Sequence, residues 1–303
     1  MRLLVEKVFQ SPITVPREEK EEGGVTIVSA VFWLLVVTAI WGTTFPLQKM
    51  VLEGVSPFVY NAIRFWIATI FAFMIEPKQN FKYGILIGLL LAGGYISQTW
   101  GLTLTTASKS GFITSLYIIF VPIVSYLWEK ERLTRFQKIG FPLAFVGSYF
   151  LSGGISGFNF GDFLTLLCAL SFSFHVVSLT VFTRKIPEKN LMGWQFGAVA
   201  ITNTLLGWNQ SWSVPLPAWG VALYTACFAT VIGIFLQMKY QKKIGSNTAA
   251  LIFVGEPIFS TFFAMLFLNE RLTGVQWFGA FLLLVALAFA SLKVKKPNLG
   301  VSG

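Results

Sequence analysis

The sequence predicts an all-α integral membrane protein of ten transmembrane helices, arranged as two inverted five-helix repeats. Three observations predict this fold: an apolar composition, ten apolar runs, and a long stretch that occurs twice. The 303 residues are 55% hydrophobic and 12% charged, whereas soluble proteins carry about 25% charged residues because their surface must be hydrated. Most of the outer surface is therefore expected to face lipid.

Each apolar run has about 17 to 23 residues, close to the ~20 that a helix needs to cross ~30 Å of hydrocarbon. Their approximate bounds are 28–48, 57–75, 83–104, 108–128, 136–152, 161–182, 191–208, 218–239, 246–268 and 274–292. The connections are short, so successive helices should be neighbours and no extramembrane domain is expected. Residues 1–27 are predicted to be a cytoplasmic N-terminal extension, and residues 294–303 a cytoplasmic tail.

The positive charges predict the orientation. With the N-terminus inside, 19 of the 23 lysines and arginines fall in inner segments, and only Lys49, Lys109 and Arg271 fall in outer ones. Cytoplasmic loops carry such an excess, so both termini should be cytoplasmic in a multi-pass protein of the plasma or inner membrane. The net charge of +10 comes without a basic stripe or a stacking platform, so no nucleic-acid partner is expected.

The two cysteines, Cys168 and Cys227, both lie inside apolar runs. Their positions predict small core residues, and their spacing fits neither a disulfide framework nor a zinc site. No metal and no cofactor are therefore expected.

One stretch occurs twice, over residues 107–140 and again over 245–279. Each copy opens at a serine, contains a proline, and ends in Glu-Arg-Leu-Thr; serine and glutamate are 23 positions apart in the first copy and 24 in the second. The copies are the fourth and ninth predicted helices, and five crossings reverse the direction of the chain. The halves 28–152 and 160–293 are thus predicted to be inverted repeats, an arrangement typical of secondary transporters with a site at the midplane.

Several short motifs resemble those of one family. They are Trp41-Gly42-Thr43-Thr44-Phe45, Arg64-Phe65, Glu131-Arg132-Leu133-Thr134, Glu256-Pro257 and Glu270-Arg271-Leu272-Thr273. Together with ten spans and a 5+5 inversion, they resemble the drug/metabolite transporter superfamily, specifically its EamA-type permeases. The resemblance implies a permease for small metabolites, often an exporter of amino acids or related compounds. It also implies a cavity lined mainly by the first, third, fourth, sixth, eighth and ninth helices.

Glu256 is the acidic residue that lies near the centre of an apolar run. An ionised carboxylate there costs roughly 2.5–3.5 kcal/mol on insertion scales, so it needs a partner, a wet cavity or a proton. Glu256 is therefore a candidate for substrate binding and for proton coupling. The structural alternative is a pair with Arg64 or with a backbone group beside Pro257.

His175, the only histidine, lies within the sixth predicted helix. It is a candidate polar contact for substrate or half of a proton relay with Glu256; the alternative is a neutral core histidine satisfied by one carbonyl. Arg64 cannot shed its charge, so its side chain must either find an acceptor or extend outward from the outer third of its helix. We favour a structural role, because arginines near helix ends can reach the headgroups.

Further polar and aromatic residues are candidates for the substrate pathway: Trp41, Thr43, Thr44, Gln48, Gln98, Ser115, Tyr117 and Gln237. Each one alone fits an ordinary interhelical hydrogen bond. As a set they could line a cavity for a small zwitterionic or aromatic solute. A polyanion would need several convergent cations. Pro122 and Pro257 interrupt helical hydrogen bonding, so each is either a hinge or a static bend.

The leading hypothesis is a secondary transporter that moves a small organic metabolite, as a monomer or homodimer, by alternating access. No nucleotide-binding loop supports ATP-driven transport. A membrane-embedded sensor or assembly protein is an alternative. A lipid-modifying enzyme is a weaker one, because convergent acid and base residues are lacking.

Overall fold

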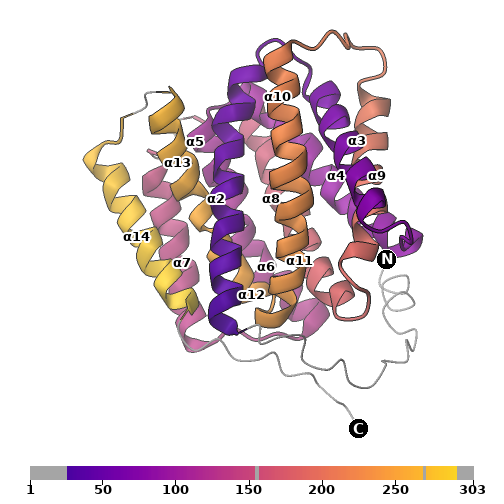
Figure 1. Cartoon of the computed structure of the whole chain (residues 1–303). Coiled ribbons are helices and arrows are strands. Elements are labelled where there is room, and N and C mark those ends of the chain that lie inside the picture. The colour runs from indigo at the N-terminus through magenta and orange to yellow at the C-terminus, as the bar shows by residue number, and fades with distance from the viewer. Residues whose placement is uncertain (1–25, 154–156, 269–270, 292–303) are drawn as a thin grey trace.

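The computed structural model describes residues 26–153, 157–268 and 271–291, and this part of the chain contains helices and no strands (Figure 1). Seven helical segments in it are long and apolar enough to cross a membrane. They are Ile27–Val51, Pro57–Ile75, Phe81–Leu104, Ala107–Glu129, Phe160–Thr183, Leu216–Ile244 and Ser246–Phe267. The predicted all-α membrane class is confirmed. Nearly all of the predicted extension, Glu270 and the predicted tail lie outside the described residues.

The elements follow the predicted runs closely. They are α2 (Ile27–Val51), α3 (Pro57–Ile75), α4 (Phe81–Leu104), α5 (Ala107–Ser115), α6 (Tyr117–Glu129), α7 (Arg135–Leu151), α8 (Phe160–Thr183), α9 (Lys189–Leu206), α10 (Leu216–Tyr224), η1 (Thr225–Ile232), α11 (Gly233–Ile244), α12 (Ser246–Phe253), α13 (Gly255–Leu268) and α14 (Gly274–Ser291). Local signals set their starts. Thr134 and Gln137 form a capping box at α7, and Asn159 and Asp162 form another at α8, which satisfies otherwise unpaired backbone N–H groups.

Both copies of the repeated stretch are broken helices. The break between α5 and α6 falls at Leu116, and the break between α12 and α13 falls at Val254. Pro122 lies inside α6, well past its break, whereas Pro257 lies in the first turn of α13, where a missing N–H costs little. The role of either proline as a hinge stays a prediction. Figure 1 shows that α5–α6 and α12–α13 run in opposite directions.

Helix packing follows a reciprocal pattern. The helices α3 and α9 pack together, as do α7 and α14. The helix α4 packs along α8, while α2 packs along α11; likewise α2 packs on α13, while α6 packs on α8. The start of α2 and the end of α14 lie at the same end of the bundle (Figure 1).

Close contact between α2 and α13 depends on Gly42. A Cβ added there would lie 2.8 Å from the backbone nitrogen of Ser260 and closer still to Phe259. We expect Gly42→Ala to lower the free energy of unfolding by about 1–3 kcal/mol, the usual cost of overpacking. Thermal unfolding of the purified protein measures this. Gly220→Ala in α10 is the matched control, since nothing lies within 4 Å of its added Cβ, and equal melting temperatures for the two variants would contradict the prediction.

Candidate binding cavity

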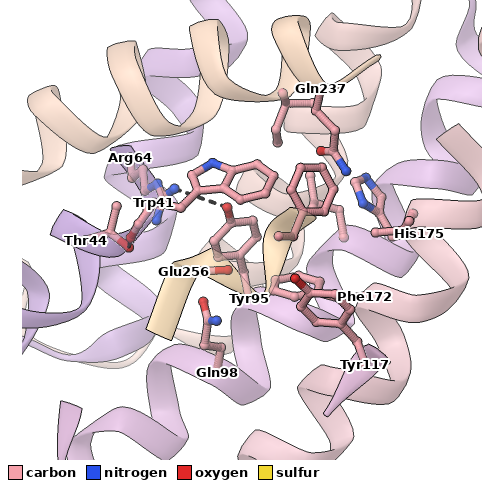
Figure 2. Close-up of a pocket in the computed structure, with 14 residues that line it drawn as sticks. Trp41, Thr44, Arg64, Tyr95, Gln98, Tyr117, Phe172, His175, Gln237 and Glu256 are labelled. Carbon is pink, nitrogen blue, oxygen red and sulfur yellow. Dashed lines mark hydrogen bonds between the residues drawn. The ribbon is translucent and has the colours of Figure 1, made fainter. Parts of the chain in front are cut away.

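A cavity of about 50 Å³ lies where α2, α3, α4, α6, α8, α11, α12 and α13 meet (Figure 2). It is large enough to hold a few water molecules. Seven of the ten candidate residues named from the sequence line it: Trp41, Thr44, Gln98, Tyr117, His175, Gln237 and Glu256. Thr43, Gln48 and Ser115 do not. The other lining residues are Arg64, Leu91, Tyr95, Phe172, Val176, Ile234 and Phe253. Residues that are distant in the sequence therefore form one mixed polar and aromatic site.

Thr43 does not line this cavity. Its hydroxyl donates to the carbonyl of Ile40 at 2.7 Å and shares a hydrogen bond of 2.8 Å with the Tyr224 hydroxyl. The adjacent Thr44 faces the cavity because successive helical residues point about 100° apart. In this conformation Thr43 joins α2 to α10.

Trp41 is fixed by the π-helix η1. Its indole Nε1 donates to the Ala229 carbonyl at 2.8 Å, and Gly233 leaves room for the ring, because a Cβ there would lie 2.9 Å from Nε1. The π-helix also lets the Thr230 hydroxyl donate to the Thr225 carbonyl, five residues back, at 3.0 Å. Short π-helices often occur at functional sites, and here one orients two groups beside the cavity.

Arg64 is the principal cavity residue that sequence reasoning placed elsewhere. It does not reach the membrane surface: its side chain is 1% exposed and lies against the cavity. Its Nε donates to the Thr230 hydroxyl at 2.9 Å and its Nη2 to the Tyr95 hydroxyl at 3.2 Å. One signal in the sequence could have indicated this. Arg64 lies seven residues after the start of α3, about 10 Å along the helix, which is far for a side chain to reach the membrane surface.

Glu256 lies near the start of α13 with 8% of its surface exposed, and it lines the same cavity. It makes no ion pair with Arg64 or with any other residue that the structure describes. Both groups lie within electrostatic range of the Tyr95 hydroxyl. Figure 2 shows Arg64, Tyr95 and Glu256 on one side of the site and His175 and Gln237 on the other.

His175 is 3% exposed, and its Nε2 has no hydrogen-bond partner within the described part of the chain. The Tyr117 hydroxyl is likewise buried without one. Gln98 has a weak contact, with its Nε2 3.3 Å from the Thr114 hydroxyl. Unpaired polar groups are costly inside a protein, so the cavity offers binding capacity that a ligand or water can satisfy.

Aromatic rings form much of the wall. Tyr95 lies edge-to-face with Phe172, with ring centroids 5.4 Å apart, and Trp41 packs on Phe253 at 5.2 Å. Phe172 lies directly over Gly94, whose added Cβ would overlap the ring. The absence of a side chain at Gly94 thus sets the position of this wall.

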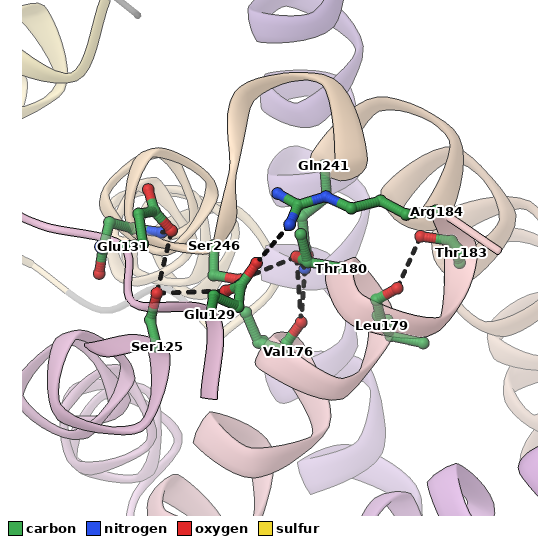
Figure 3. A network of polar contacts seen from close by, with 11 residues as sticks. Ser125, Glu129, Glu131, Val176, Leu179, Thr180, Thr183, Arg184, Gln241 and Ser246 are labelled. Atoms are coloured by element: carbon green, nitrogen blue, oxygen red, sulfur yellow. Dashed lines mark hydrogen bonds and ion pairs between the residues drawn. The ribbon is translucent and has the colours of Figure 1, made fainter. Parts of the chain in front are cut away.

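A polar network lies at the end of the bundle where α2 begins (Figure 3). Arg184 Nη1 lies 3.2 Å from Glu129 Oε1, and the Ser246 hydroxyl donates to Glu129 Oε2 at 2.5 Å. The Ser125 hydroxyl lies 3.1 Å from Glu129 Oε2 and 2.9 Å from Glu131 Oε2. These contacts join α6, the loop after it, α8 and α12.

The network connects to the cavity through two glutamines. Gln237 lines the cavity and donates to Gln241 Oε1 at 2.9 Å. Gln241 Nε2 donates to the Val176 carbonyl and to the Thr180 hydroxyl, each at 2.6 Å, and the Thr180 hydroxyl shares a hydrogen bond of 2.8 Å with the Ser246 hydroxyl. A continuous chain of hydrogen bonds therefore leads from the cavity wall to Glu129.

Glu131 lies in the loop after α6. Its burial raises the pKa of its carboxyl above the ordinary value, because removal from water disfavours the charged form. Hydrogen bonds from Ser125 and from the Asn247 backbone, and the nearby Arg184 charge, act in the opposite direction. The pKa of the Glu131 carboxyl therefore depends on whether this network is closed or open.

A second polar cluster lies between α4, α5 and α8. Lys109 Nζ lies 2.6 Å from Asp162 Oδ2, and the Thr105 hydroxyl donates to Asp162 Oδ1 at 2.8 Å. Among the described residues, no three His, Cys, Asp or Glu side chains gather as a metal-binding group. Cys168 and Cys227 are free thiols.

The fold and cavity define an integral membrane protein with a polar site enclosed by its helices. The EamA-like transporter family matches residues 28–153 and 159–292, and the chain belongs to this family. The predicted family is confirmed.

Several known proteins are similar to this chain. An uncharacterised transporter of Archaeoglobus fulgidus is 39% identical, with 91% of each chain covered. A probable amino-acid metabolite efflux pump of Salmonella typhimurium is 25% identical over 84% of this chain and 92% of its own. A crystal structure with 19% identity has the same fold, with a TM-score of 0.73 over 88% of this chain and 98% of the other. The relatives from Archaeoglobus fulgidus and Salmonella typhimurium are named as a transporter and an efflux pump, not as enzymes.

Proposed function

We propose that this protein is a secondary transporter that exports a small organic metabolite, an amino acid or a related compound, by alternating access. Ten helical segments would cross the membrane as two inverted repeats, with both termini cytoplasmic and the cavity near the midplane. The observation that carries this proposal is the cavity itself. It places Glu256, a carboxyl with no ion-pair partner among the described residues, beside residues drawn from both family-matched segments.

The helix packing supports the inverted arrangement. If α2–α7 correspond to α8–α14 in order, the main contacts between the two halves occur in matching pairs. The contact of α4 with α8 corresponds to that of α11 with α2, and the contact of α2 with α13 corresponds to that of α8 with α6. The broken helices α5–α6 and α12–α13 would then be equivalent, and irregular backbone of this kind accompanies transporter sites.

The network around Glu129 would be the closed cytoplasmic gate of this transporter. It joins α6, α8 and α12 at one end of the bundle, and it reaches the cavity through Gln241 and Gln237. A substrate that takes the Gln237 amide would compete with the hydrogen bond to Gln241. Binding in the cavity would thereby loosen the gate, as alternating access requires.

The gate should respond to pH through Glu131. Its raised pKa means that the closed network favours the protonated carboxyl, whereas a hydrated Glu131 returns toward its ordinary pKa of 4.5. Opening should therefore become easier as the pH rises from about 4.5 through the raised pKa, by linkage. Amide hydrogen exchange in α12, corrected for its intrinsic pH dependence, measures this opening.

Glu131→Gln mimics the protonated state and should make that pH profile less steep. Glu129 and Arg184, which face Glu131, remain in place in this variant. Exchange in α9 serves as the internal control because α9 contributes no residue to the network. Protection of α12 that increases with pH in the unmodified protein would contradict the prediction.

Transport itself is tested with the purified protein in liposomes. A panel of labelled amino acids and related amines and carboxylic acids is loaded inside, and exchange against the same unlabelled solute is measured. We expect exchange of at least one small zwitterion at a rate above that of empty liposomes. Absence of exchange across the panel would overturn the proposal. The polar cavity argues against a non-transporting sensor, because such a protein needs no internal site.

A further inference from the structure

The guanidinium of Arg64 has one nitrogen without a hydrogen-bond partner among the described residues, and the residue lines the cavity. Its Nε and Nη2 are bound by Thr230 and Tyr95, but Nη1 is buried and has no hydrogen-bond partner among the described residues. The aromatic rings of Tyr95 and Phe65 lie 4.6 and 5.2 Å from Cζ and hold the group in place. The guanidinium is therefore fixed in place, and its Nη1 is left unpaired.

Such a charge needs an anion. A buried, unpaired charge is strongly unfavourable, and an arginine keeps its proton. The described residues supply no salt bridge to it. Glu256 lines the same cavity but forms no ion pair with Arg64, so the site presents a guanidinium and a carboxyl group that are each available to a ligand.

From this geometry we infer that Arg64 is a substrate-binding residue that takes the carboxylate of a zwitterion, while Glu256 takes its ammonium group. The inference rests on the proposed function and specifies its substrate class. A carboxylate matches the planar donors of a guanidinium, and an ammonium group matches a carboxylate. A solute with only one of these charges leaves the other protein group unpaired in the membrane.

The remaining walls specify the rest of the solute. Phe172, Trp41 and Phe253 offer apolar faces, while His175 and Gln237 lie on the side of the site away from Arg64. A polyanion is disfavoured because Arg64 is the single cation among the described lining residues. The chemistry of the lining therefore favours a monoamino monocarboxylic acid with an apolar or aromatic side chain.

Binding to the purified full-length protein tests this inference with three matched probes for each side chain. For the aromatic set these are L-phenylalanine, L-phenylalaninamide, which lacks the carboxylate, and 3-phenylpropionate, which lacks the ammonium. L-alanine, L-alaninamide and propionate form the small set. We expect an amino acid to bind at least about tenfold tighter than either partner, since a hydrogen bond to a charged group contributes about that factor or more.

Substitutions identify the protein groups responsible. In Arg64→Gln the preference for the acid over the amide should fall to about one, while the preference over the compound lacking ammonium persists. In Glu256→Gln the preference over the compound lacking ammonium should fall to about one, while the preference for the acid over the amide persists. Arg132→Gln, which removes an exposed arginine, should keep both preferences. If Arg64→Gln does not fold, Arg64→Lys is the alternative. It keeps the charge without the planar guanidinium donors, and it should reduce the ratio of the affinity for the acid to that for the amide.

A carboxylate preference that survives in the Arg64 variants overturns the inference, as does an unmodified protein that fails to distinguish acid from amide. Lack of binding by both amino acids at millimolar concentration overturns it as well. These outcomes are distinct from failure of the proposed function. Liposome transport of solutes without carboxylate dependence keeps the transporter and removes the role of Arg64. Carboxylate-dependent binding without any transport would keep the role of Arg64 and remove the proposed transport function.

Discussion

Replacing Glu256 with Gln is expected to abolish the response of transport to an imposed pH gradient while the protein still folds and inserts. Glutamine has nearly the same shape as glutamate but cannot exchange a proton. Glu256 lies in the cavity without an ion-pair partner in the described chain. In a membrane such a group is by default a candidate for coupling, so its loss removes the site at which a proton could be carried.

The measurement is solute accumulation in liposomes with and without a pH difference of known sign. The unmodified protein should accumulate solute above the level set by its concentration outside, and Glu256→Gln should only equilibrate it. Glu53→Gln, which changes an exposed carboxyl, is the matched control and should behave as the unmodified protein. A Glu256→Gln variant with an unchanged pH response would remove this carboxyl from the coupling mechanism.

Gly94→Ala is expected to reduce transport at least about tenfold, because the added methyl displaces the wall of the cavity. The new Cβ would overlap the Phe172 ring, which can move only into a space of about 50 Å³. The ring of Tyr95, which packs edge-to-face on Phe172, would shift as well. Substrate uptake by liposomes containing the variant measures the loss.

A second substitution should restore activity. Phe172→Leu shortens the side chain that Gly94→Ala displaces, so the double variant should transport better than Gly94→Ala alone, as a non-additive pair in contact does. Gly220→Ala is the control for the addition of a methyl group to a helix. If Phe172→Leu fails to improve transport, Gly94→Ala acts through something other than this contact.

Much of the fold could be predicted because membrane helices leave a strong signal in composition and length. Apolar runs and charged loops located the helices to within a few residues. The site residues Trp41, Gln98 and Glu256 could be selected because polar groups in apolar runs are few and costly. Their convergence on one cavity is a property of the packing, and the sequence supplied only the candidates.

The role of Arg64 could not be predicted, because it depends on what lies beside it. An arginine in a membrane helix either extends to the surface or binds partners inside. Thr230 and Tyr95, far from it in the sequence, settle this choice. Thr43 and Thr44 show the same limit at smaller scale: they are adjacent and chemically identical, yet one binds Tyr224 and the other faces the cavity.

The breaks at Leu116 and Val254 and the network around Glu129 were also beyond sequence reasoning. Pro122 drew attention to a position six residues past the break in its helix. Glu129 and Arg184 are 55 positions apart, and Ser246 lies a further 62 positions along the chain, so only tertiary structure brings the three side chains together.

The π-helix η1 makes the site sensitive to chain length and not only to residue type. A π-helix holds one residue more per hydrogen-bonded turn than an α-helix, and this register is what turns Thr230 toward Arg64 and Ala229 toward Trp41. Deletion of a single residue within Thr225–Ile232 would rotate both groups away, although the identities of the residues that line the cavity would not change. A one-position gap at this stretch in a related protein therefore marks a different binding chemistry, even where the residues that line the site are identical.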